Sequence, residues 1–266
     1  MSELLESPAA SRTDSSHPNY KWVVLSNTTL GTLLAFVNAS IVLISLPAIF
    51  RGIGLNPLQP ANVGYLLWML MGYLVVTAVL VVPFGRLGDM YGRVRLYNIG
   101  FIVFTVAAVA LSFDPFADGA GAIWLIAWRV VQGVGGAMLM ASSSAILTDA
   151  FPANQRGMAL GVNMVAAVAG SFLGLLLGGL LSEFHWQAIF WVGVPLGILG
   201  TVWSMRSLRE LGERTPGTMD WAGTVTFGIG LTALLIGITS GIQPYGGNST
   251  GWTNPMVLAS IAAGLA

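Results

Sequence analysis

Long apolar runs separated by short polar segments dominate the sequence. Seven runs are long enough to cross a bilayer, since a spanning helix needs about 20 mostly apolar residues that satisfy their backbone groups internally. The pattern therefore predicts an all-α protein, a polytopic transmembrane helical bundle. The predicted spans cover approximately residues 22–48, 61–84, 94–113, 121–149, 157–181, 187–206 and 219–242.

An eighth apolar run starts near Pro255 and reaches the last residue, Ala266. Its roughly twelve residues are too few to cross a bilayer. We therefore expect a chain truncated inside a further helix. The alternative is a short tail that lies in the membrane interface.

The polar segments divide the chain into parts. Residues 1–20 are rich in Ser, Pro and acidic groups, which predicts a disordered N-terminus. Residues 207–218 (SLRELGERTPGT) combine charge with Gly and Pro and predict a linker. We thus expect a six-helix bundle over 21–206, the linker, and a segment 219–266 that holds an additional helix and the start of the next one.

Composition supports a membrane protein and excludes several other classes. Charged residues make up 8% of the chain and mean hydropathy is +0.77, whereas a soluble domain carries roughly 25% charge. The net charge of zero gives no attraction to nucleic acid. Cysteine is absent and the two histidines lie far apart, so we expect no metal site and no cofactor. A phosphate-cradling GxxxxGK[ST] loop is also missing, so we expect neither direct use of ATP nor a hydrolytic enzyme.

The basic residues predict how the chain is oriented. Nine of the eleven Lys and Arg residues fall on one side of the predicted spans, whereas Arg51 falls on the other side and Arg129 lies within a span. Under the positive-inside rule, the side with the nine basic residues faces the cytoplasm, and the N-terminus lies on that side. We therefore expect a multi-pass protein of the plasma membrane with a cytoplasmic N-terminus. The nine residues are Arg12, Lys21, Arg86, Arg93, Arg95, Arg156, Arg206, Arg209 and Arg214.

The segment GRLGDMYGRVR lies in the short loop predicted between the second and third spans. Gly85 and Gly92 permit a tight turn, and Asp89 can accept hydrogen bonds from Arg93. Such a cluster can latch one conformation of a protein and release it in another. Chemistry alone favours the other interpretation, a solvated turn whose basic residues only set topology.

Arg129 stands inside an otherwise apolar predicted helix, in the stretch WRVVQGVGGAM. An Arg at the centre of a membrane helix costs at least ~2.5–3.5 kcal/mol, so it needs a wet cavity or a partner. We therefore expect a functional role for Arg129. The alternative is that its side chain reaches the membrane interface, since it lies about eight residues into the span.

These two segments resemble motifs of the major facilitator superfamily. GRLGDMYGRVR is similar to the loop signature G-x-L-[GA]-D-[RK]-x-G-[RK]-[RK], with departures at Met90 and Val94. RVVQGVGGA is similar to R-x-x-Q-G-x-G-x-A, a fourth-helix motif of proton-coupled facilitators. The resemblance implies a role for Arg129 and Gln132 in proton coupling or substrate response. It also implies that Asp149, at a DAFP turn, joins Asp89 and Arg93 in one charge network.

Further segments resemble fourteen-helix drug:proton antiporters. Residues 38–47 are similar to LD-x-TIVN-x-ALP, with Asn38 in place of the titratable Asp, so Asn38 is left to hydrogen-bond a substrate or a neighbouring helix. HWQAIFWVGVPLG and DWAG, which starts at Asp220, are similar to the subfamily's sixth-helix stretch and to the start of its extra seventh helix. In that subfamily two additional helices separate the six-helix halves, so the resemblance implies a C-terminal half of the same transporter.

The fifth predicted span carries glycines at a spacing of four. Gly170, Gly174 and Gly178 share one helix face, which favours close helix packing. The segment also resembles the antiporter motif G-x-x-x-G-P-x-x-G-G, but Leu175 replaces the proline, which weakens the inference of antiport.

Four polar or aromatic residues are candidates for the lining of a substrate cavity: Asn38, Trp68, Tyr73 and Asn163. The alternative for the aromatic residues is that they face lipid or the membrane interface.

The combined expectation is a secondary transporter that exports drug-like or amphipathic small molecules in exchange for protons. Two alternatives stay open. The chain is either a half-transporter that dimerises, or a transport-inactive membrane protein that works as a sensor or assembly partner.

Overall fold

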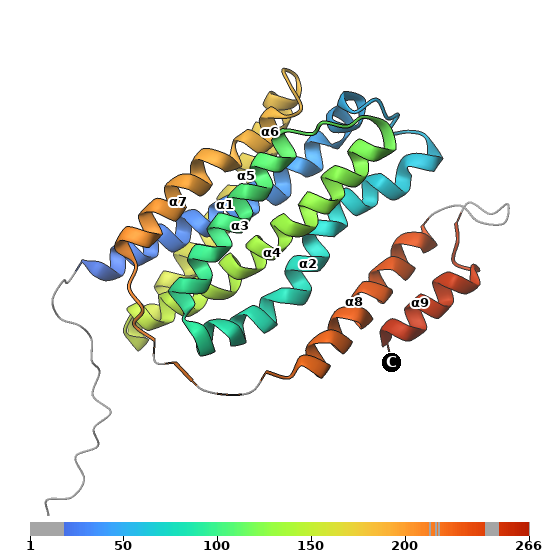
Figure 1. Ribbon diagram of the computed structural model, residues 1–266. Coiled ribbons are helices and arrows are strands. Elements are labelled where there is room, and N and C mark those ends of the chain that lie inside the picture. The colour runs from blue at the N-terminus through green and yellow to red at the C-terminus, as the bar shows by residue number, and fades with distance from the viewer. Residues whose placement is uncertain (1–18, 213, 216, 218, 243–249, 266) are drawn as a thin grey trace, which may run out of the picture.

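The computed structural model describes residues 19–212, 214, 215, 217, 219–242 and 250–265 (Figure 1). The N-terminal disorder was expected for residues 1–20, and residues 1–18 lie outside the described part of the chain. Arg12 and Ala266 lie outside it as well. Within the described residues the regular structure is entirely helical. The elements are α1 (Tyr20–Gly52), the 3-10 turn η1 (Pro60–Asn62), α2 (Val63–Tyr91), α3 (Arg93–Ser112), α4 (Asp118–Ala150), α5 (Ala153–Ser182), α6 (Ala188–Trp191), α7 (Gly193–Ser207), α8 (Trp221–Gly241) and α9 (Pro255–Leu265).

The prediction of an all-α bundle with seven membrane-length segments is confirmed. In the described residues, seven helical segments are long and apolar enough to cross a bilayer, and they match the seven predicted runs. The sixth segment, Ala188–Ser207, consists of α6 and α7 with a break at Val192. The eighth run forms α9, which has 11 described residues.

The boundary between α2 and α3 differs from the expected loop. α2 continues through the glycine-rich segment to Tyr91, and α3 begins at Arg93. Gly85 therefore lies inside a helix, and Gly92 alone makes the connection, with φ at +115°. A single glycine suffices because its left-handed backbone reverses the chain without a Cβ penalty.

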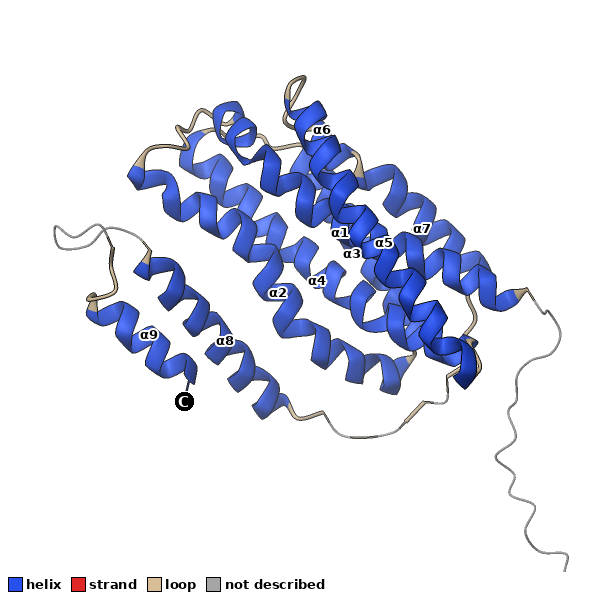
Figure 2. Ribbon diagram, turned by 180° about the vertical axis from the view of Figure 1, so that it is seen from behind, coloured by secondary structure: helices blue, strands red, loops and turns tan. Residues whose placement is uncertain are grey.

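Helices α1 to α7 pack as one bundle, and α8 and α9 form a hairpin beside α2 (Figures 1 and 2). The most extensive contacts join α1 to α5 and α4 to both α2 and α3. The apolar core has two parts. One surrounds Phe101 and Phe104, and the other surrounds Phe50 and Phe190.

The glycines of α5 allow that helix to approach α1 closely. A Cβ atom added to Gly170 would lie 2.9 Å from the carbonyl oxygen of Leu33. At Gly174 the corresponding distance to the Val37 oxygen is 2.5 Å, and at Gly178 the distance to the Ile41 oxygen is 2.7 Å. All three glycines expected to serve helix packing thus contact the α1 backbone.

The two ends of the bundle differ in charge. We call one end the basic end: α1, α3 and α5 begin there, and α2, α4 and α7 end there. Its basic residues are Lys21, Arg86, Arg93, Arg95, Arg156, Arg206, Arg209 and Arg214. The opposite end carries the connection between α1 and α2 together with Arg51.

Candidate functional site

Arg129 on α4 is a buried charge in the interior of the bundle, with an exposed fraction of 1%. Its Nη1 donates hydrogen bonds to Asn38 Oδ1 on α1 (2.5 Å) and to Gln132 Oε1 one turn along α4 (2.8 Å). Its Nε donates to the carbonyl oxygen of Met69 on α2 (3.3 Å). The guanidinium therefore joins three helices, and it does not reach the membrane interface.

The partners of Arg129 leave its charge without a counter-ion. Asn38, Gln132 and the Met69 carbonyl are neutral, and Arg129 makes no ion pair with any described residue. Its guanidinium carbon lies 4.5 Å from the ring centroid of Tyr73, which adds a cation–π contact. Neutral oxygens and a ring face stabilise a buried cation less than a carboxylate does. The cluster is thus suited to receive a negative charge or to respond to one.

Tyr73 on α2, which lies against the Arg129 guanidinium, is itself held by a hydrogen bond to α1. Its hydroxyl donates to the carbonyl oxygen of Ala35 (3.3 Å), and its side chain is 3% exposed. Thr77, one turn along α2, donates to the carbonyl oxygens of Tyr73 (2.7 Å) and Gly133 (3.2 Å). The sequence pattern did not indicate Thr77, because a lone Thr in an apolar helix carries no signal of its partner.

The other two cavity candidates lie elsewhere. Asn163 on α5 donates to the Ser143 hydroxyl (3.3 Å), which is 3.4 Å from Thr32 Oγ1 on α1. Ser143 is about three helical turns from Gln132 along α4. Trp68 on α2 is partly exposed and forms no side-chain hydrogen bond with the described residues. The structure therefore groups Asn38 and Tyr73 with Arg129 and Gln132, but not Asn163 or Trp68.

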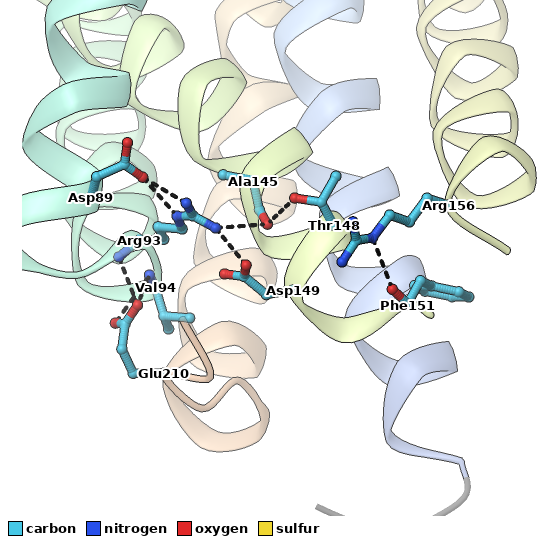
Figure 3. Close-up of polar contacts among 9 residues, drawn as sticks. All are labelled: Asp89, Arg93, Val94, Ala145, Thr148, Asp149, Phe151, Arg156 and Glu210. Carbon is cyan, nitrogen blue, oxygen red and sulfur yellow. Dashed lines mark hydrogen bonds and ion pairs between the residues drawn. The ribbon is translucent and has the colours of Figure 1, made fainter. Parts of the chain in front are cut away.

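A second polar network lies at the basic end (Figure 3). Arg93 at the start of α3 contacts Asp89 on α2 through Nε (2.9 Å) and Nη2 (2.7 Å). Its Nη1 contacts Asp149 at the end of α4 (2.5 Å) and the carbonyl oxygen of Ala145 (3.5 Å). These side chains are partly buried, between 21% and 33% exposed. Arg93 thus bridges two carboxylates from two different helices.

Glu210, in the segment after α7, is a member of this network that the sequence analysis missed. Its Oε1 accepts a hydrogen bond from the backbone N–H of Arg93 (2.7 Å), and Oε2 accepts one from the backbone N–H of Val94 (3.2 Å). Glu210 lies in the segment 207–218 that was predicted to be a linker. Nothing in the local sequence indicated which helix it contacts, because the two segments are more than 100 residues apart.

Gly85 and Gly92, the two glycines predicted to belong to the latch, have different surroundings. A Cβ at Gly92 would lie 2.8 Å from Glu210 Oε2, whereas a Cβ at Gly85 would meet nothing within 4 Å. A side chain at position 92 would therefore displace the Glu210 carboxylate, whereas one at position 85 would disturb no neighbour. Among the described residues, no group of three or more His, Asp and Glu side chains is placed to hold a metal ion.

Comparisons with known proteins agree with this architecture. A profile of the Major Facilitator Superfamily matches residues 28–266. The chain is 33% identical to an uncharacterised MFS-type transporter of Mycobacterium tuberculosis over 254 residues, which cover 94% of this chain and 40% of the relative. It is 34% identical to a multidrug efflux pump of Mycolicibacterium smegmatis over 223 residues, covering 83% of this chain and 41% of the pump.

A relative named for a different substrate is the riboflavin transporter of Clostridioides difficile. Its identity is 31% over 234 residues, which cover 83% of this chain and 49% of the transporter. The chain therefore spans less than half the length of these curated relatives.

A solved structure shares the fold. It is a bacterial homologue of the human lysosomal transporter Spinster, in an inward-facing and unoccupied conformation. The TM-score is 0.58 at 19% identity, and the match covers 92% of this chain and 59% of the solved chain.

Proposed function

The chain belongs to the Major Facilitator Superfamily, and from this membership we propose that the full-length protein is a secondary active transporter. It exports drug-like or amphipathic small molecules in exchange for protons by alternating access. Relatives named as multidrug resistance or efflux proteins support the substrate class. The relatives are about twice as long as this chain, which supports a C-terminal half that completes the transporter.

The observation that carries the proposal is the buried Arg129 without an acidic partner among the described residues. A charge held by neutral acceptors in a membrane interior is costly, and such residues mark substrate or proton pathways. Asn38 cannot carry a proton as a carboxylate does, so α1 contributes no titratable group at this position. We therefore assign the response to protons or substrate to Arg129 and Gln132.

The basic-end network supplies the conformational part of the proposal. Arg93 joins the ends of α2, α3 and α4 through Asp89 and Asp149. Breaking these ion pairs frees the helix ends to move, and making them holds the ends together. In the proposed cycle the network latches one state of the transporter.

The proposed location is the plasma membrane, with the basic end in the cytoplasm. The gathering of Lys and Arg at one end supports this orientation under the positive-inside rule. The lipid bilayer, protons and a small-molecule substrate are the proposed partners.

The deciding experiment uses the full-length protein in proteoliposomes with an imposed pH gradient. A substrate panel includes ethidium, a typical efflux probe, and riboflavin, because one relative is a riboflavin transporter. We expect proton-driven transport of at least one compound by the wild type. Arg129→Ala should abolish that transport at equal protein levels.

Arg51→Ala is the matched control, since Arg51 is exposed at the opposite end and forms no ion pair with a described residue. This variant should transport like the wild type. Unchanged transport by Arg129→Ala would remove Arg129 from the mechanism. Absence of substrate-dependent proton movement across the panel would instead favour the transport-inactive sensor.

A further inference from the structure

Five residues that follow α7 lie across the basic end of the bundle. We call them the strap: Leu208, Arg209, Glu210, Gly212 and Thr215. Leu208 is 8% exposed and packs in the same core cluster as Phe101 and Phe104. The strap is therefore a packed part of the six-helix bundle, although its hydrophilic composition suggests only a connector.

The strap contacts the basic ends of four helices. The Arg209 backbone N–H donates to the Tyr20 hydroxyl on α1 (2.7 Å), and Glu210 accepts from the start of α3. A Cβ at Gly212 would lie 2.7 Å from Asp149 Oδ2 on α4. The Thr215 N–H donates to the carbonyl oxygen of Asp89 on α2 (3.0 Å). Every helix end that supplies a residue to the charge network is therefore touched by the strap as well.

Glu210 is the anchor of the strap on α3. The first N–H groups of a helix have no partner inside the helix, and a carboxylate there also interacts favourably with the helix dipole. Glu210 binds the N–H groups of Arg93 and Val94, the first two residues of α3. Hydrogen bonds to a charged group are about twice as strong as neutral ones. The close approach is possible because Gly92 has no side chain.

Arg93 is consequently held from two directions. Its backbone is bound by Glu210, and its guanidinium is bound by Asp89 and Asp149. The guanidinium can bridge the two carboxylates only while the first turn of α3 keeps its place. The strap contact at Glu210 therefore bears directly on that first turn.

We propose that Glu210 is a positioning residue of the basic-end network, which ties the strap to α3 and so couples the position of the strap to the bridge made by Arg93. The network's role as a latch rests on the proposed function, whereas the coupling between the strap and the network is a property of the chain itself. Opening of the strap and opening of the bridge are then one event.

The first test measures hydrogen–deuterium exchange of the full-length protein in nanodiscs. Glu210→Ala removes both bonds to the α3 backbone, and Glu210 is exposed, so the fold tolerates its loss. We expect the amides of Arg93 and Val94 to exchange about fivefold faster, as for the loss of a helix cap. Glu183→Ala is the control, since Glu183 is exposed at the opposite end and its side chain bonds to none of the described residues. Wild-type exchange in Glu210→Ala would overturn the anchor.

The second test asks whether losing the anchor opens the bridge. This chain has no cysteine, so spin labels at Tyr91→Cys and Asn154→Cys, both exposed at the basic end, are unique within it. Any cysteine in the rest of the full-length chain is replaced by serine. Asp149→Asn, which breaks one ion pair directly, defines the opened distance distribution. Glu210→Ala should shift the distribution in the same direction, by about fivefold in the population ratio.

Each outcome separates the coupling from transport itself. Faster exchange at α3 with an unchanged distance distribution would make Glu210 a helix cap only and overturn its positioning role. Partial restoration of both signals by Glu210→Gln, which keeps one acceptor oxygen, supports the proposed contact. If the wild type transports nothing in proteoliposomes, the proposed function fails, while the exchange and distance measurements still decide the coupling.

Discussion

At the scale of single residues, we expect alanine substitutions at Gly92 and Gly85 to change the stability of the protein in opposite directions. Gly92→Ala places a Cβ on a backbone with φ of +115° and 2.8 Å from Glu210 Oε2. We expect a loss of stability of about 1–2 kcal/mol from the left-handed backbone and the weakened cap. Thermal unfolding in detergent, followed by tryptophan fluorescence, measures the change.

Gly85→Ala is the internal control for that prediction. Gly85 lies inside α2, with nothing within 4 Å of an added Cβ. Alanine is favoured over glycine in a helix interior by roughly 0.5–1 kcal/mol. The unfolding temperature should therefore stay equal or rise. A larger loss for Gly85→Ala than for Gly92→Ala would contradict the assignment of Gly92 as the turn.

The sequence alone identified Arg129 but neither its contacts with other helices nor the role of Glu210, and the reason is physical. Arg129 was conspicuous because a charge in an apolar run is costly. Its partners Asn38 and Met69 come from other helices, and helix contacts depend on rotation angles that a sequence pattern does not fix. Glu210 was not predicted, because an acidic residue in a polar segment has no desolvation penalty that would distinguish it in the sequence.

At the scale of elements, the pairing of α5 with α1 depends on backbone proximity. Gly174→Ala would put a Cβ 2.5 Å from the Val37 oxygen and 2.9 Å from Ser40 Cβ. The helices would have to separate, and overpacking of this kind costs about 1–3 kcal/mol. We expect a lower unfolding temperature in detergent.

Gly179→Ala is the control on the same helix, because an added Cβ there meets nothing within 4 Å. Its unfolding temperature should equal or exceed that of the wild type, because alanine is favoured over glycine inside a helix. Equal effects of the two substitutions would show that helix propensity, and not the contact with α1, governs this part of α5.

Element existence followed from hydropathy, whereas element boundaries did not. Each of the seven predicted runs corresponds to a span because an unsatisfied backbone is excluded from lipid. α2 extends to Tyr91 because polar residues at the membrane edge can remain helical. The break at Val192 between α6 and α7 has no hydropathy signal, since apolar residues flank it on both sides.

At the scale of the whole molecule, the helical hairpin of α8 and α9 lies beside α2, at the edge of the six-helix bundle (Figure 2). α8 packs mainly on α9 and touches α2 less extensively. Close contacts at Gly230, Gly237 and Gly264 join the hairpin. Hydropathy predicted the seventh span, and the resemblance to a subfamily with extra helices agreed with it. Neither predicted that the strap residues after α7 contact the basic end of the bundle.

The orientation of the whole molecule gives the last prediction. Leu58, 89% exposed in the connection between α1 and α2, and Tyr91, 57% exposed at the basic end, mark opposite ends of the bundle. With the other cysteines of the full-length protein removed, a membrane-impermeant maleimide should label Leu58→Cys in intact cells. Tyr91→Cys should react only after the membrane is opened, because the positive-inside rule predicts a cytoplasmic location for the end that is rich in Lys and Arg. Labelling of Tyr91→Cys in intact cells would invert the orientation and place the proposed latch outside the cell.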